Sequence, residues 1–248
     1  ICEYAKEKNQ NILCILGGPE FPAGTGQRKI ENTISDNTYD KCFKYLKFRP
    51  KVDYFVYTDG EVAFIEILNE YLKNQKSVKV MKEDDKPING CASLTKDKSK
   101  LLVGGYVDRI GMFGSVKENG RDIIPSPYTT GLLDKFLNGN FIPAFETSRG
   151  CPFLCDFCDQ GLDMSKITTF STERMCKEIA YVGQKISKIN GGTKKISIFD
   201  SNWGMYEKDV DLSYGILETM NKYDWPEYIE CLTPKSNREN LLKINDIL

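Results

Sequence analysis

Short apolar runs alternate with segments of helical periodicity along most of this chain, and this alternation constrains the fold more than any other feature. Residues 12–16 form one apolar run, closed by two glycines and a proline, and residues 52–57 form another, rich in β-branched and aromatic side chains. Such runs are typical of buried strands, and the segments 40–48 and 61–73 that follow them have the composition and spacing of helices. The pattern predicts an α/β fold whose front part is a Rossmann-like, doubly wound sheet.

The last hundred residues repeat the pattern three times. The predicted strands are 141–145, 195–199 and 228–232, and the predicted helices are 172–188, 207–222 and 238–248. Three such units make up about half of an eight-fold (β/α) barrel. We therefore expect a front domain over residues 1–75, a connector over 76–140 and a partial barrel over 141–248. The chain does not begin with Met and stops within a predicted helix, so we expect it to be truncated at both ends.

Three of the nine cysteines, Cys151, Cys155 and Cys158, fall within eight residues. An odd number of cysteines in a chain of this length favours metal ligation over a disulfide framework. The chain has no histidine and no second closely spaced cysteine pair, so a four-ligand zinc site is hard to complete. The alternative to an iron–sulfur enzyme is a non-catalytic binding module that carries iron–sulfur or zinc. For the other six cysteines we expect the role of small core residues.

The spacing of this cluster, with Phe157 directly before the third cysteine, resembles the cluster motif of the radical S-adenosylmethionine (radical SAM) superfamily. The resemblance implies a [4Fe–4S] cluster held by the three cysteines, with S-adenosylmethionine on the open iron and one-electron cleavage to a 5′-deoxyadenosyl radical. It also implies an electron donor such as flavodoxin or ferredoxin and a small-molecule or natural-product-like substrate. The part of the chain over 141–248 then corresponds to the N-terminal half of a radical SAM barrel.

Polar residues follow the second and third predicted strands of the barrel part. Asp200 and Asn202 come directly after residues 195–199, and the resemblance implies that they bind the ammonium group or the ribose hydroxyls of S-adenosylmethionine. The alternative is that they cap the following turn. Lys235, after the third strand, reaches a carboxylate or is a solvated surface lysine. Arg149 pairs with a cluster sulfide, a phosphate or Glu146.

In the front part, Gly17 and Gly18 follow the first strand, and Glu61 follows the turn after the second. This arrangement resembles the later half of a cobalamin (B12)-binding domain, in which glycines let the nucleotide tail approach the backbone closely. The resemblance implies that cobalamin is a third cofactor and that the reaction is a methylation, with radical rearrangement as the close alternative. A doubly wound domain that binds no cofactor is the other interpretation.

The composition limits the classes of partner. The net charge is −1 in 248 residues, so no basic surplus favours nucleic acid or an anionic membrane surface. Apolar residues make up 40% of the chain and charged residues 28%, as in globular proteins. No apolar run is long enough to span a bilayer and no signal peptide is visible, so we expect a cytoplasmic protein.

Overall fold

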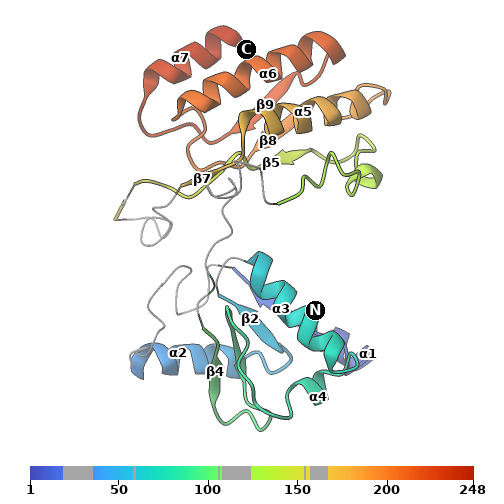
Figure 1. The fold of residues 1–248 in the computed structure, drawn as a ribbon, viewed down its shortest axis with the longest axis vertical. Coiled ribbons are helices and arrows are strands. Elements are labelled where there is room, and N and C mark those ends of the chain that lie inside the picture. Colours follow the sequence, from blue (N-terminus) through green and yellow to red (C-terminus); the bar gives the residue numbers. More distant parts are fainter. Residues whose placement is uncertain (19–35, 58–59, 106, 108–123, 154, 157–166) are drawn as a thin grey trace. The chain divides into compact units, whose positions relative to one another are not determined.

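The computed structural model describes residues 1–18, 36–57, 60–105, 107, 124–153, 155–156 and 167–248. The chain divides into two compact units, Ile1–Ile110 and Gly111–Leu248 (Figure 1). Among the described helices, none is both long and apolar enough to cross a membrane.

The first unit is built on a four-stranded sheet with the order β1 (Ile15–Gly17), β2 (Tyr54–Val56), β3 (Cys91–Leu94) and β4 (Leu101–Val103). β1 and β2 are parallel, as the strand–helix pattern predicts, but β3 and β4 join them in antiparallel fashion. These two strands lie in the range expected to be a connector. They escape prediction because they are only four and three residues long and stand among lysine- and aspartate-rich segments.

Helices cover both faces of this sheet. The helices of the unit are α1 (Cys2–Lys8), α2 (Asp36–Lys47), α3 (Gly60–Lys73) and the single turn α4 (Val78–Met81). Successive side chains of a strand point to opposite faces, so Tyr54 and Val56 share an apolar cluster with Ile67 of α3, whereas Phe55 packs in a second cluster with Leu46 of α2. The front part is therefore an α/β fold, as predicted, with helices on both faces of the sheet around the parallel pair of β1 and β2.

The second unit contains a parallel sheet whose strands follow one another in chain order, β5 (Ala144–Phe145), β8 (Lys195–Ile198) and β9 (Tyr228–Cys231). The helices α5 (Thr172–Ile186), α6 (Glu207–Tyr223) and α7 (Arg238–Ile247) lie side by side over it (Figure 1), and a short 3₁₀ helix, η2 (Asp134–Phe136), precedes β5. Consecutive parallel strands with a helix after each are the arrangement predicted for the partial barrel. β5 is shorter than predicted because Pro143 has no N–H for the ladder, although its carbonyl accepts from the Ser197 N–H at 3.0 Å.

Local sequence explains how the helices of this unit begin and pack. The Ser171 hydroxyl accepts from the Arg174 N–H at 3.2 Å, so Ser171 caps the N-terminus of α5. α5 and α6 approach closely at Gly215, where an added Cβ would lie 2.2 Å from the sulfur of Cys176. Cys176 therefore serves helix packing, in line with the role expected for the cysteines outside the cluster.

Candidate metal and cofactor site

The cysteine segment connects β6 (Ser148–Arg149) to β7 (Thr168–Thr169). These two strands pair as a two-stranded antiparallel ribbon. Asp200, directly after β8, fixes the start of this ribbon. Its Oδ1 accepts from the Thr147 and Ser148 backbone N–H groups at 2.6 and 3.1 Å. Its Oδ2 accepts from the hydroxyls of both residues, at 2.7 Å in the case of Ser148. The side chain is thus buried against the segment that leads into Cys151.

The role predicted for Asp200 differs from the one that these contacts support. The carboxylate does not cap the turn that follows it, because its hydrogen bonds run to residues 52 and 53 positions earlier. It holds the cysteine segment against the end of β8 instead, and Lys208 adds a hydrogen bond of 3.1 Å to the Thr147 hydroxyl. That Asp200 contacts S-adenosylmethionine stays a prediction.

Asn202 brings the end of β8 to the first cysteine of the motif. Its Nδ2 donates to the sulfur of Cys151 at 3.3 Å, and both residues are buried. The Oδ1 of the same amide is buried with no hydrogen-bond partner among the described residues. An unsatisfied buried carbonyl costs free energy, so this oxygen is available to a donor that the protein binds.

Lys235, in the loop after β9, brings the next strand end to the second cysteine. Its ammonium nitrogen lies 3.1 Å from the sulfur of Cys155 and 5.6 Å from the centre of the Phe153 ring. A contact with a cysteine sulfur was not among the two interpretations considered for Lys235. Two neighbouring strand ends thus each direct an N–H group at a cysteine of the motif.

Three further polar groups of the second unit are two buried hydroxyls and a guanidinium. The hydroxyls of Tyr206 and Thr168 are buried without a hydrogen-bond partner in the described part of the chain. Burial, with smaller contributions from Asp209 and Cys151, raises the pKa of Tyr206 above its ordinary value. The Arg149 guanidinium, by contrast, pairs with Glu146 at 2.8 Å, and Glu146 was one of the three partners considered for it.

The donor set fits a thiolate-bound cluster. Thiolates are hydrogen-bond acceptors, and the groups directed at Cys151 and Cys155 are N–H donors. Cys158 and Phe157 lie outside the described residues. Within the ranges that the structure describes, no three of the metal-binding residue types come together as a complete site.

The cofactor residues predicted in the front unit lie at one edge of its sheet. Gly17 ends β1 and Glu61 lies in the first turn of α3, which follows β2, so the parallel pairing of these strands brings both to their carboxyl edge. Gly18 has a φ of +114°, a region that L-residues with a side chain rarely adopt. Among the described residues, no atom lies within 4 Å of a Cβ added at Gly18 or at Gly60, so none of these residues blocks the approach of a ligand to this backbone.

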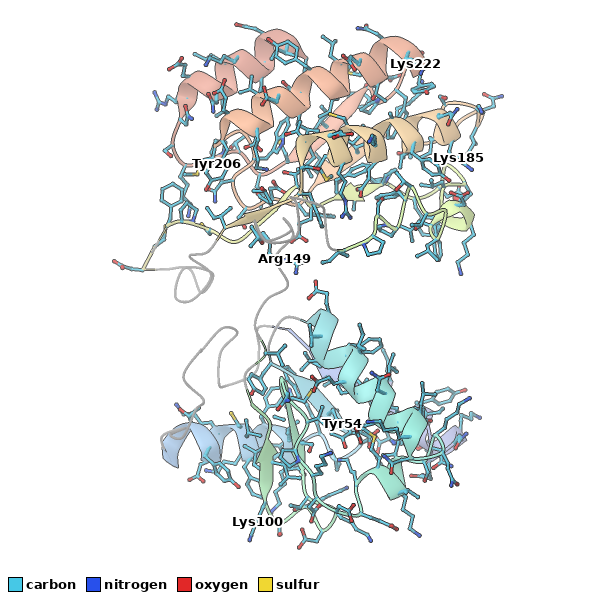
Figure 2. The ribbon with its side chains drawn as sticks, in the orientation of Figure 1. Tyr54, Lys100, Arg149, Lys185, Tyr206 and Lys222 are labelled. Atoms are coloured by element: carbon cyan, nitrogen blue, oxygen red, sulfur yellow. The ribbon has the colours of Figure 1, made fainter. Side chains whose placement is uncertain are left out.

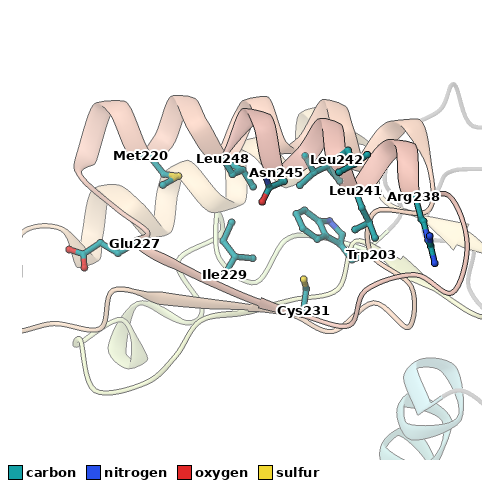
Figure 3. A pocket seen from close by; sticks show the side chains of 11 residues that line it. Trp203, Met220, Glu227, Ile229, Cys231, Arg238, Leu241, Leu242, Asn245 and Leu248 are labelled. Carbon is teal, nitrogen blue, oxygen red and sulfur yellow. The ribbon is translucent and has the colours of Figure 1, made fainter.

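A pocket of about 890 Å³ lies on the helix-covered side of β9 (Figure 3). Trp203, Ile229 and Leu241 are among its largely apolar lining residues. It contains none of the predicted site residues, so it is separate from the groups around Cys151.

No family model matches the chain. It is 24% identical over 252 residues to the cobalamin-dependent radical SAM methyltransferase TokK of Streptomyces tokunonensis. It is 23% identical over the same length to a 2-(S-pantetheinyl)-carbapenam-3-carboxylate methyltransferase of Streptantibioticus cattleyicolor. Each alignment covers 99% of this chain and 31% of the relative, so the chain spans about a third of their length.

This chain is a distant homologue of cobalamin-dependent radical SAM methyltransferases. Its fold agrees with part of a solved structure, that of the cobalamin-dependent S-adenosylmethionine radical enzyme OxsB, which it matches with TM-scores of 0.51 to 0.55 at 14 to 16% identity. The match covers 99% of this chain and 30% of OxsB.

The sequence alone did not indicate Thr147, Ser148 and Tyr206 as residues of the site. The only signal available for the first two was their position directly before the Arg-Gly-Cys start of the cluster motif.

Proposed function

We propose that this chain holds the [4Fe–4S] cluster and S-adenosylmethionine of a cobalamin-dependent radical SAM enzyme, and that the enzyme transfers a methyl group. The observation that carries the proposal is the convergence of two strand-end donors on Cys151 and Cys155. The spacing of the cysteine motif and the distant homology support it. The cofactors, when bound, would supply the one-electron cleavage of S-adenosylmethionine and a carrier for the methyl group.

In this proposal, Cys151, Cys155 and Cys158 are the three thiolate ligands of the cluster. The unpartnered Oδ1 of Asn202 accepts from the ammonium group of S-adenosylmethionine. Asp200 keeps the cysteine segment in place through its four hydrogen bonds.

The front unit has the complementary role of binding cobalamin. Gly17 and Gly18 leave the backbone accessible to the nucleotide tail, and Glu61 lies near the edge of the corrin. The support for this assignment is the position of these residues at one edge of the sheet and the open space around Gly18 and Gly60.

Anaerobic reconstitution of the full-length protein tests the proposal. We expect about four irons and four sulfides per chain, as a cubane requires, and 5′-deoxyadenosine formation from S-adenosylmethionine on reduction. The triple variant C151A/C155A/C158A should lose both. Cys231→Ala is the control, because Cys231 lines the separate apolar pocket and should not affect iron content.

The possible outcomes separate the alternatives. Zinc in place of iron would support the non-catalytic binding module instead. A cluster that never cleaves S-adenosylmethionine would contradict the enzymatic part of the proposal. Retention of hydroxocobalamin after desalting, measured by its visible absorption, tests the front unit independently of the cluster.

A further inference from the structure

We propose that Asn202 and Lys235 act as a pair of N–H donors that raise the reduction potential of the cluster through hydrogen bonds to the sulfurs of Cys151 and Cys155. This inference rests on the proposed function, because it assumes that these cysteines bind the cluster. Both residues are positioning residues in this role.

The contact of Asn202 is short, buried and fixed by the fold. The side chain of Asn202 is 7% exposed and that of Cys151 is 5% exposed, with 3.3 Å between Nδ2 and the sulfur. Asn202 follows β8 by four residues, and its neighbour Trp203 is anchored by a backbone hydrogen bond to Leu232, at 2.9 Å. Water therefore competes little with this hydrogen bond.

The contact of Lys235 differs in charge and in exposure. Its ammonium group lies 3.1 Å from the sulfur of Cys155, and the side chain is exposed. A charged donor forms a stronger hydrogen bond than a neutral amide, but solvent and salt screen an exposed charge. Asn202 thus affects the sulfur of Cys151 through a buried neutral N–H dipole, whereas Lys235 affects the sulfur of Cys155 through an exposed positive charge.

Hydrogen bonds to the sulfurs are among the factors that set the potential of an iron–sulfur cluster. Reduction adds one negative charge to the cluster and its thiolates. N–H dipoles and an ammonium group beside those sulfurs stabilise the reduced state more than the oxidised state. Removal of either donor should therefore lower the potential and make the cluster harder to reduce.

Potentiometry monitored by electron paramagnetic resonance on the reconstituted full-length protein, without S-adenosylmethionine, measures this effect directly. We expect Asn202→Leu and Lys235→Met each to lower the equilibrium constant of reduction about tenfold, which is about 59 mV for one electron. Lys235→Arg, which keeps both charge and N–H groups, should restore most of the potential.

Lys222→Met is the matched control, since Lys222 lies in the last turn of α6, at the opposite end from Tyr206 (Figure 2). It removes the same charge and should leave the potential unchanged. In about 1 M salt, where the screening length is roughly 3 Å, the effect of Lys235→Met should shrink and that of Asn202→Leu should persist.

The outcomes distinguish this inference from the proposed function. A wild-type protein that takes up no iron would contradict the proposed function and this inference together. A wild-type cluster whose potential is unaffected by both substitutions would contradict this inference alone. If the buried Asn202→Leu change prevents cluster uptake, the comparison of Lys235→Met with Lys235→Arg decides the question, because Lys235 is exposed and its replacement should not disturb folding.

Discussion

The two units place buried aspartates at opposite ends of their parallel strands. In the second unit these groups lie after the strands, where Asp200 binds the segment that begins at Thr147. In the first unit they lie before the strands, where Asp53 precedes β2, pairs with Lys6 at 2.7 Å and accepts from the Cys14 N–H at 2.8 Å. The carboxyl edge of the first unit instead carries Gly18 and Gly60, where an added Cβ would meet no described residue within 4 Å.

In the proposed function, this difference corresponds to two kinds of binding site. A small metal cluster needs ligands held within tenths of an ångström, and Asp200, Asn202 and Lys235 supply such positioning around the cysteines. The proposed large planar cofactor needs room and accessible backbone, and no described residue meets a Cβ added at Gly18 or Gly60. The buried ion pair at the far edge of the first unit stabilises the sheet without occupying that space.

The largest expected effect is that of Asp200→Ala on the second unit. Four hydrogen-bond donors would lose a buried, charged acceptor, so we expect a loss of about 5 kcal/mol in the free energy of unfolding. Both tryptophans of the chain, Trp203 and Trp225, are buried in this unit, so their fluorescence during urea unfolding reports on it selectively. Asp211→Asn, on the exposed side of α6, is the control. A loss of less than 1 kcal/mol would show that the cysteine segment is held by other contacts.

Asp53→Ala is the corresponding change in the first unit. It leaves the Lys6 ammonium buried without its partner, and removal of one member of a buried ion pair costs about 3 kcal/mol or more. Hydrogen exchange of the β1 and β2 amides should detect this loss, whereas tryptophan fluorescence should not change. The double replacement K6M/D53L should recover part of the stability, and a double variant as unstable as Asp53→Ala would contradict the assignment to the ion pair.

The sequence allowed the strand–helix repeats and the cysteine motif to be predicted, because both depend on residues close together in the chain. The contacts that organise the site could not be predicted in this way. Asp200 reaches Thr147 across 53 positions, and Lys235 reaches Cys155 across 80. The position of Asp200 and Lys235 after predicted strands indicated the correct edge of the sheet. Only the fold shows which residue each side chain contacts.

The two units can also be compared by their response to alkaline pH. Burial raises the pKa of Cys91, on β3 of the first unit, from its ordinary value of 9.0 to about 12. Between these values the unfolded chain loses the thiol proton while the folded chain keeps it. The contribution of this thiol to the free energy of unfolding is therefore fully present below pH 9 and is lost as the pH rises toward 12. The slope from this group is at most about 1.4 kcal/mol per pH unit. Cys91→Ala should make the decline in hydrogen-exchange protection of β1 and β2 with pH less steep. An unchanged decline would mean that other groups cause it, such as Tyr54, because burial raises the pKa of Tyr54 as well.

The smallest expected effect on stability is that of Gly60→Phe, and it examines the open edge of the first unit most directly. Gly60 is the first residue of α3 and is exposed, and no described residue lies within 4 Å of a Cβ added there, so the fold should tolerate a large side chain with a change of about 0.5 kcal/mol or less. If cobalamin occupies this edge, the ring of the new side chain takes part of its space, and we expect hydroxocobalamin affinity to fall about tenfold, a cost of about 1.4 kcal/mol in binding. Gly60→Ala, which adds only a methyl group, should bind nearly as well as the wild type. Equal hydroxocobalamin binding by the wild type and both variants would mean that the cofactor does not bind at this edge. The proposed difference in function between this edge and the cysteine site would then be wrong.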